Sequence, residues 1–383
     1  MKLRHWMWSF CFCALLGRAA AAAEWDVHRF EGRDYVTLEN LAAFYAFPKP
    51  APLSPPTPAT IAALVAGAAS ASEFGITAAA TLAAASRTIV LDSGAMHLEV
   101  TPGLSEVNIN GVKQWLAFPV RIEDGRALVS RLDLSKIIEP RLRPELIEGL
   151  QPVTTVVLDP GHGGHDRGAI SRFGFEKDFA LDVALRARPL LEKAGYKVVM
   201  TRATDIFIPL EERPAIANRI PNSIFVCIHF NASSSNADAR GFEIFSIAPR
   251  GVPATNDSTP SERDLRAEPG NAVELPSGAL AGSVFHALLG QVPMVDRGLK
   301  HARFAVLRLC ERPAVLVECG FVSNPAESSL ISSGAWRARI AEAVADGVEN
   351  YRALAETRQR PRVLADYRRA AAGHLQLRDT GTP

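Results

Sequence analysis

The chain has 383 residues, of which 48% are hydrophobic and 22% charged, and its formal net charge is +1. This length allows two ordinary domains, and the composition allows at least one large core. A charge so close to neutral excludes a general basic field for nucleic acid, so no nucleic-acid partner is expected and any charge-driven binding has to be local.

Residues 1–23 have the pattern of a secretory signal peptide. Lys2 and Arg4 give a positive start, residues 6–16 are apolar, and residues 19–23 offer a cleavage site of small side chains. A membrane anchor is the weaker alternative, because the apolar run is shorter than the roughly 20 residues that span a bilayer. No other stretch is expected to be long and apolar enough to span. The sequence therefore predicts export to the periplasm or cell envelope, with no stable membrane span after signal removal.

Three cysteines follow that segment: Cys227, Cys310 and Cys319. An odd number argues against a disulfide framework, even in an oxidising compartment. We expect them to be buried free thiols.

Residues 24–148 are predicted to form a small α+β, strand-rich domain around an Ala/Pro-rich insert at 48–85. Short apolar runs joined by Asn110-Gly111 and Asp124-Gly125 are typical of β-hairpins. Together with Phe118-Pro119 and the run 128–130, these turns resemble the N-terminal domain of copper amine oxidases. The resemblance implies a small module and no copper chemistry, because nothing in it clusters like metal ligands.

From Val153 onward the pattern changes to alternating strands and helices. The predicted strands are 153–158, 197–201, 224–229, 242–246, 304–307 and 314–318, and the predicted helices are 176–193, 210–218, 278–289 and 335–354. This indicates an α/β domain at 149–356, with a mostly parallel six-stranded sheet and helices on both faces. The remaining residues, 357–383, are predicted to be a solvated basic tail, with weak contact to anionic wall polymer or lipid headgroups as the alternative.

Polar residues stand where several predicted strands end. His162 lies in a glycine-rich loop directly after the first strand of this domain, while His229 and Glu318 end two others. In open α/β sheets ligands collect beyond the carboxyl ends of the strands, so the fold would bring these residues together. Each alone has a structural alternative, a satisfied histidine or a solvated glutamate.

Glu176 begins the first predicted helix of this domain, where the helix dipole alone favours a carboxylate by roughly 0.3–1 kcal/mol. Two histidines and one glutamate nevertheless form a recognised ligand set for catalytic zinc, which leaves one tetrahedral position open. Glu318 would then act as the general base, because a zinc-activated water still needs a proton acceptor.

The stretch from Val153 to Ala353 resembles the zinc-dependent N-acetylmuramoyl-L-alanine amidases of the amidase-3 family. The resemblance is carried by 158–164, 175–177, Thr201-Arg202 with Asp205, Leu210 and Arg213, 217–218, 229–232, 241–243, 304–307 and 313–325. It implies an amidase-3 fold, Zn²⁺ held by His162, Glu176 and His229, and Glu318 as the catalytic acid/base. The implied reaction is hydrolysis of the amide between N-acetylmuramoyl residues and L-alanine in peptidoglycan, in wall remodelling and daughter-cell separation.

Other functions stay open at this point: a zinc carboxypeptidase acting on stem peptides, and a non-catalytic wall-binding protein. The sequence also leaves open whether an activator protein is required. Asn231 is expected to contact substrate, as is Arg303, which precedes a predicted strand whose end should border the cleft. The Pro/Gly/Ser-rich insertion at 249–277 is predicted to be a flexible flap rather than a long helix.

Overall fold

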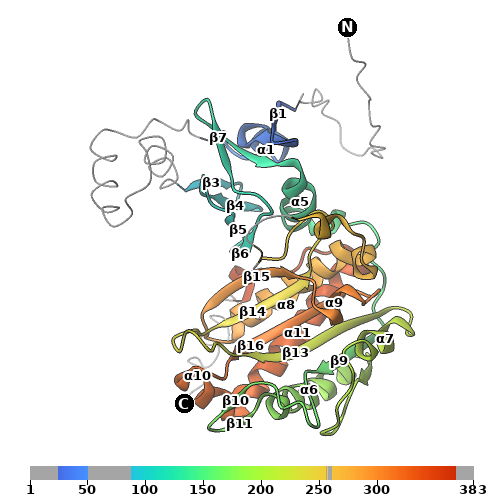
Figure 1. The fold of residues 1–383 in the computed structure, drawn as a ribbon. Helices are drawn as coiled ribbons and strands as arrows, with labels where there is room; N and C mark the ends of the chain where they lie inside the picture. The colour runs from blue at the N-terminus through green and yellow to red at the C-terminus, as the bar shows by residue number, and fades with distance from the viewer. Residues whose placement is uncertain (1–24, 51–87, 256, 258–260, 368–383) are drawn as a thin grey trace, which may run out of the picture.

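The computed structural model describes residues 25–50, 88–255, 257 and 261–367 (Figure 1). The predicted signal peptide, most of the Ala/Pro-rich insert and the end of the basic tail lie outside the described residues.

The largest sheet has ten strands in the order β12-β9-β13-β16-β14-β15-β6-β5-β4-β3. Six come from the predicted α/β region: β12 (Lys197–Met200), β9 (Thr155–Pro160), β13 (Ser223–Asn231), β16 (Ala314–Phe321), β14 (Phe242–Ile247) and β15 (Asp296–Ala302). Four come from the N-terminal region: β6 (Val112–Trp115), β5 (Glu106–Ile109), β4 (His97–Val100) and β3 (Ile89–Asp92). Figure 1 shows β6 next to β15, where a single residue pair, Leu299 with Gln114, joins the two groups.

The prediction of a mostly parallel six-stranded sheet was wrong, because the sheet is mixed. Strands β12, β9, β13 and β16 pair in parallel, but β14 pairs antiparallel to β16, and β3 to β6 form antiparallel hairpins. The loop 232–241 between β13 and β14 explains the reversal. It contains no helix, whereas a return to a parallel strand needs a crossover of a dozen or more residues, usually a helix.

One predicted strand was also misplaced. Residues 305–307 fall in a short helix, α9 (Ala305–Arg308), which Phe304 precedes. The strand of this region is β15, just before it. The apolar run Phe304 to Leu307 has the composition of a buried strand, whereas β15 is interrupted by Arg297, Gly298 and Lys300.

Helices cover both faces of this sheet, as predicted for an α/β fold. On one face, α6 (Glu176–Lys193), α8 (Glu274–Gln291) and α11 (Gly334–Thr357) share a core with residues such as Val156, Val226 and Val317. On the other face, α7 (Glu212–Asn218) and α9 pack on Val157, Phe225 and Leu316. The next helix, α10 (Pro325–Ser332), follows β16.

The N-terminal region has its own core, built around Tyr35, Leu98, Leu128 and Ile138. Its second sheet has the order β1-β2-β8-β7. The elements of this region that are not yet given are β1 (Val27–Phe30), β2 (Arg33–Thr37), α1 (Leu38–Phe44), β7 (Arg121–Glu123), β8 (Arg126–Ser130), α4 (Arg131–Asp133), η1 (Leu134–Ile138), α5 (Glu139–Leu142) and η2 (Pro144–Leu146). The remaining short elements are β10 (Ile170–Ser171), β11 (Gly174–Phe175), η3 (Glu262–Leu265) and η4 (Pro269–Val273).

Among the described residues, one helical stretch, Pro269–Gln291, is long and apolar enough by composition to cross a membrane. The expectation that no such stretch follows the signal was therefore wrong. The stretch comprises η4 and the core helix α8, and 72% of its apolar window is buried inside the protein. Cys227, Cys310 and Cys319 are buried and free, as predicted.

The described part of the predicted basic tail packs back on the N-terminal region. Arg358 donates to the backbone oxygen of Ile147, and Arg360 donates to that of Leu142 and pairs with Glu145. The segment 358–363 thus connects the end of α11 to the first part of the chain.

Candidate metal centre

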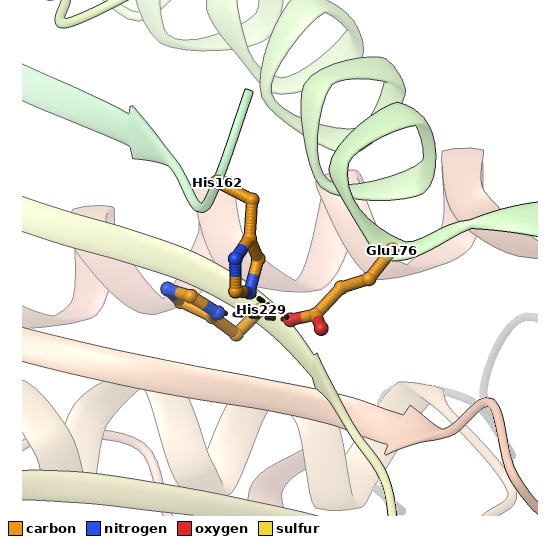
Figure 2. A group of neighbouring side chains, drawn as sticks. All are labelled: His162, Glu176 and His229. Carbon is orange, nitrogen blue, oxygen red and sulfur yellow. Dashed lines mark hydrogen bonds and ion pairs between the residues drawn. The ribbon is translucent and has the colours of Figure 1, made fainter. Parts of the chain in front are cut away.

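Three side chains from separate elements converge at one end of the sheet (Figure 2). His162 follows β9, Glu176 is the first residue of α6, and His229 lies in β13. The Oε1 atom of Glu176 is 3.1 Å from Nε2 of His162 and 2.9 Å from Nδ1 of His229. One ligand atom from each residue lies within 4.8 Å of the others. The structure therefore brings the three predicted ligands together.

Glu176 is held rigidly, with only 4% of its surface exposed. Besides the two histidines, the backbone N–H groups of Phe230 and Ala169 donate to its carboxylate at 3.0 and 2.8 Å. Burial acts to raise the pKa of this carboxyl, but the hydrogen bonds and charges of His162 and His229 outweigh it and hold the pKa well below its usual range. Glu176 is therefore a fixed anion facing the two rings.

His162 is oriented by a residue that the sequence analysis missed. Its Nδ1 atom lies 2.8 Å from Oδ2 of Asp166, which leaves Nε2 facing Glu176. Burial lowers the pKa of His162, yet the hydrogen bonds and charges of Glu176 and Asp166 outweigh it, so the pKa is raised overall. A carboxylate on the second ring nitrogen is the usual support of a metal-binding histidine. The two residues are four positions apart in the sequence, but that spacing alone does not predict the contact.

Two buried arginines hold the loop that carries His162. Arg213 donates to the backbone oxygen of His162 at 2.8 Å, and Arg202 donates to that of Gly161 at 2.7 Å. His162 itself has a φ of +59°, a left-handed conformation that is costly for a residue with a side chain. The sequence gives Arg202 and Arg213 only as motif positions, and the structure shows that they fix this strained loop.

Glycine is required at two positions around these side chains. A Cβ at Gly161 would lie 2.3 Å from the His229 ring, and one at Gly168 would lie 2.6 Å from both Glu176 and His162. The glycine-rich stretch therefore lets the backbone approach the three side chains closely.

Glu318 lies beside this cluster on β16, in register with His229 of β13. Within the described chain its Oε2 atom is buried and has no hydrogen-bond partner. Burial and the nearby charges of Glu176 and Glu243 raise the pKa of Glu318 well above its usual range, against the opposing charge of Lys300. Glu318 is therefore a carboxyl with a free oxygen and a strong tendency to take up a proton.

Glu243 stands on the other side of Glu318 and was not singled out from the sequence. It is the antiparallel register partner of Glu318 on β14, and it accepts from Asn231, Arg297 and Lys300 at 2.7, 2.9 and 2.5 Å. Asn231 is thus brought to the site, although its amide nitrogen is engaged by Glu243.

Arg303 does not join the other predicted site residues. It follows β15, which runs parallel to β14 and therefore antiparallel to β13 and β16, so it lies at the opposite end of the sheet. There Nη1 of Arg303 lies 2.8 Å from Oδ1 of Asp264, a buried ion pair, and Nη2 donates to Val252. Nη1 makes no aligned hydrogen bond, so the Asp264 contact is electrostatic.

The insertion at 249–277 packs at that same far end. Thr255 exchanges hydrogen bonds with the backbone of His301, and Asn271 donates to Ala248. The described part of the insertion therefore does not cover the three converging side chains.

The donor set itself suits a metal. Two imidazoles and one carboxylate match the ligands that Zn²⁺ takes in catalytic sites, where three protein ligands leave one position for water or substrate. Their ligand atoms already converge, and Asp166 supplies the outer support. The residues present thus fit a zinc ion.

Comparisons with known proteins show what the chain is similar to. A family profile described as N-acetylmuramoyl-L-alanine amidase matches residues 156–350. The chain is 35% identical over 218 residues to N-acetylmuramoyl-L-alanine amidase AmiA of Escherichia coli (strain K12), a match that covers 51% of this chain and 75% of that protein. It is 34% identical over 224 residues to the amidase AmiC of Neisseria meningitidis, covering 53% of each chain.

Among solved structures, an N-acetylmuramoyl-L-alanine amidase from Clostridium difficile 630 is 31% identical, with a TM-score of 0.44, over 52% of this chain and 97% of that one. The chain spans about half the length of the Neisseria relative. Because the family profile covers half of the chain, from β9 into α11, the chain belongs to the N-acetylmuramoyl-L-alanine amidase family.

Proposed function

We propose that this protein is an exported, zinc-dependent amidase that cleaves the bond between N-acetylmuramoyl residues and L-alanine in peptidoglycan. The observation that carries the proposal is the convergence of His162, Glu176 and His229 beside Glu318, whose Oε2 has no partner among the described residues. A binding protein has no need of an unpartnered carboxyl beside a metal-ligand set. Wall remodelling and daughter-cell separation are the processes that such an activity would serve.

Each group has a definite part in the proposed reaction. His162, Glu176 and His229 would hold Zn²⁺, which supplies a Lewis acid that polarises the scissile carbonyl and acidifies the attacking water. Glu318 would accept the proton of that water as its oxygen bonds to the lactyl carbonyl carbon. The carbon–nitrogen bond then breaks, and Glu318 returns the proton to the nitrogen of L-alanine. The products are a carboxylate on the sugar and a stem peptide with a free amine.

The surroundings of Glu318 suit this exchange of a proton. Its raised pKa makes it a stronger proton acceptor than an exposed glutamate. Asn231, whose amide donates to Glu243, the register partner of Glu318, is the proposed contact for substrate. The position of Arg303 gives no support to its predicted role as a contact.

Digestion of purified peptidoglycan, followed by mass spectrometry of the soluble products, tests the proposal. We expect intact stem peptides that begin with L-alanine, loss of activity with a chelator, and recovery on adding Zn²⁺. Release of a terminal amino acid would instead identify a carboxypeptidase. Wall binding without products, for metal-loaded protein both alone and with a cell-envelope extract that could supply an activator, would leave only a binding function.

A pair of histidine variants provides the matched control. His229→Ala should lose the metal and the activity together, because it removes one of three ligands. His165→Ala changes an exposed histidine only three residues from His162 and should retain both. Equal metal content in the two variants would exclude His229 as a ligand.

A further inference from the structure

A cavity of about 80 Å³ lies where the N-terminal region, α8 and the C-terminal segment meet. A buried water occupies roughly 10–15 Å³ by a comparable measure, so this space holds several waters or a small ion. Arg141 and His286 lie in its inner wall, and the exposed residues Ala95 and Arg360 line its outer part. No aspartate or glutamate is among the described residues that line it.

Arg141 is the unusual member of this cavity. Its Nε donates to Gln114 at 2.8 Å, but within the described residues its two terminal nitrogens have no acceptor and no carboxylate partner. They face α8, since a Cβ at Gly278 would lie 3.1 Å from both of them. The nearby Arg143, in contrast, has its carboxylate, Glu139, at 2.6 Å.

The charge of Arg141 is not offset by its surroundings. Burial lowers the pKa of Arg141 to about 10, and no acidic group of the described segments opposes this effect. Burial, followed by the charge of Arg141, lowers the pKa of His286 to about 4, although Asp366 acts in the other direction. His286 is thus neutral at pH 7, and its Nδ1 is buried without a partner. Arg141 is half-buried, so its guanidinium is less well solvated than one in water, and an anion in the cavity would relieve that cost.

We propose that this cavity binds a phosphate group, with the terminal nitrogens of Arg141 as its main donors. The planar guanidinium offers parallel N–H groups to two oxygens of an oxyanion. Arg360 lies at the outer part of the cavity, where it also forms an ion pair with Glu145. The phosphate is either the free ion or the phosphoryl headgroup of a lipid, because both present the same oxygens.

Binding here would join three parts of the chain. Arg141 comes from α5, His286 from α8, and Arg360 from the segment after α11. A ligand that contacts all three stabilises the folded chain in proportion to its occupancy. The site lies apart from the metal centre, so the inference does not depend on the amidase activity.

Titration of the full chain with inorganic phosphate, at constant ionic strength set with chloride, tests the site by calorimetry and by thermal unfolding. We expect saturable binding and a rise in Tm for the wild type. Arg141→Gln should weaken binding by at least about tenfold. Arg188→Gln, which removes an exposed arginine from α6, is the matched control and should bind as the wild type does.

A second variant keeps the test decisive if Arg141→Gln does not fold. Position 282 has room, because a Cβ there would be 3.8 Å from Nη1 of Arg141. Gly282→Asp should supply the missing anion, and so raise the Tm without phosphate and abolish the phosphate response. Gly282→Ala, which makes the same backbone change without the charge, should keep the response.

The proposal is overturned if the wild type does not saturate at about 50 mM phosphate, since such weak binding does not need a built site. It is also overturned if phosphate raises the Tm of Arg141→Gln or Gly282→Asp as much as that of the wild type. Sedimentation with phosphatidylglycerol vesicles then identifies the source. Vesicle binding that Arg141→Gln abolishes indicates a lipid headgroup, and vesicle behaviour unchanged by the variant assigns the site to the free ion.

Discussion

Charged side chains lie at both ends of the large sheet, but their contacts differ between the two ends. At one end His162, Glu176, His229 and Glu318 converge, and the single Oε1 of Glu176 faces both histidines. At the other end Arg303 pairs with Asp264, and Lys136 pairs with Glu274, beneath the 249–277 insertion and the N-terminal region. Each of these four side chains has its own partner of opposite charge. Convergence around a shared centre is what the proposed metal site requires, whereas one-to-one pairs such as these need serve only stability.

Replacing the free carboxyl at the converging end should have the largest effect. We expect Glu318→Gln to lower kcat by about 10²–10⁴-fold, the usual contribution of a general acid or base. The Zn²⁺ content should not change, because Glu318 is not among the converging ligand atoms. Peptidoglycan turnover and metal analysis of the same preparation check this. Full activity in the variant would remove Glu318 from the mechanism.

Breaking a closed pair at the other end should affect stability instead. Asp264→Ala leaves Arg303 buried without its anion, and we expect the free energy of unfolding in urea to fall by about 3–5 kcal/mol. Turnover per folded, metal-loaded molecule should stay near that of the wild type, because the pair lies far from the ligands.

The double variant Asp264→Leu with Arg303→Met is the control for that comparison. It removes both charges and keeps apolar volume, so it should recover much of the lost stability. If Asp264→Ala or the double variant lost as much turnover as Glu318→Gln, the two ends of the sheet would be coupled.

Removing the outer support of His162 should produce an intermediate effect at the metal end. Asp166→Ala is expected to weaken Zn²⁺ binding by about 10–100-fold, because the ring loses the carboxylate that orients it. Competition with a chelator of known affinity measures the change. Asp178→Ala, which removes an exposed acid from α6 two residues after Glu176, is the matched control. Equal affinities for the two variants would contradict the orienting role.

The sequence was sufficient for part of this site and not for the rest. His162 and His229 could be placed because each follows a clearly apolar run that forms a parallel strand. The sequence did not predict the contacts of Glu243 with Arg297 and Lys300. Both of these residues lie in β15, which contains charges and a glycine and does not have the composition of a buried strand. Arg303 was expected near the cleft, but it lies at the opposite end of the sheet. The composition of a strand does not indicate its direction, and the helix-free loop 232–241 makes β14 run antiparallel to β16.

Asp166 and Arg141, which pairs with no carboxylate in the part of the chain that the structure describes, show a second limit. Asp166 meets His162 because residues 162–168 form a tight loop with left-handed φ angles, a local geometry that spacing alone does not specify. Arg141 comes to face α8 only when the N-terminal region docks on the sheet. Contacts between distant segments depend on that docking, which no short sequence pattern encodes.

The smallest predicted effect concerns His301, which lies at the opposite end of the sheet from His162. Burial and the charges of Arg141 and Arg303 lower the pKa of His301 to about 3, whereas the carboxylates around His162 raise its pKa. His301 therefore stays neutral in the folded chain below pH 6.5, while the unfolded chain takes up a proton there. Stability should be complete above pH 6.5 and should fall by about 1.4 kcal/mol for each pH unit below it on account of this residue.

Urea unfolding of the wild type and of His301→Gln at pH 8, 6 and 5 measures that contribution. The difference at pH 8 contains only the packing cost of the substitution, since the histidine is neutral in both states of the chain. Between pH 6 and pH 5 the variant should lose about 1.4 kcal/mol less than the wild type, because it has no ring to protonate on unfolding. Parallel curves across this range would mean that His301 is protonated in the folded protein, and that this end of the sheet is less closed than its pairs imply.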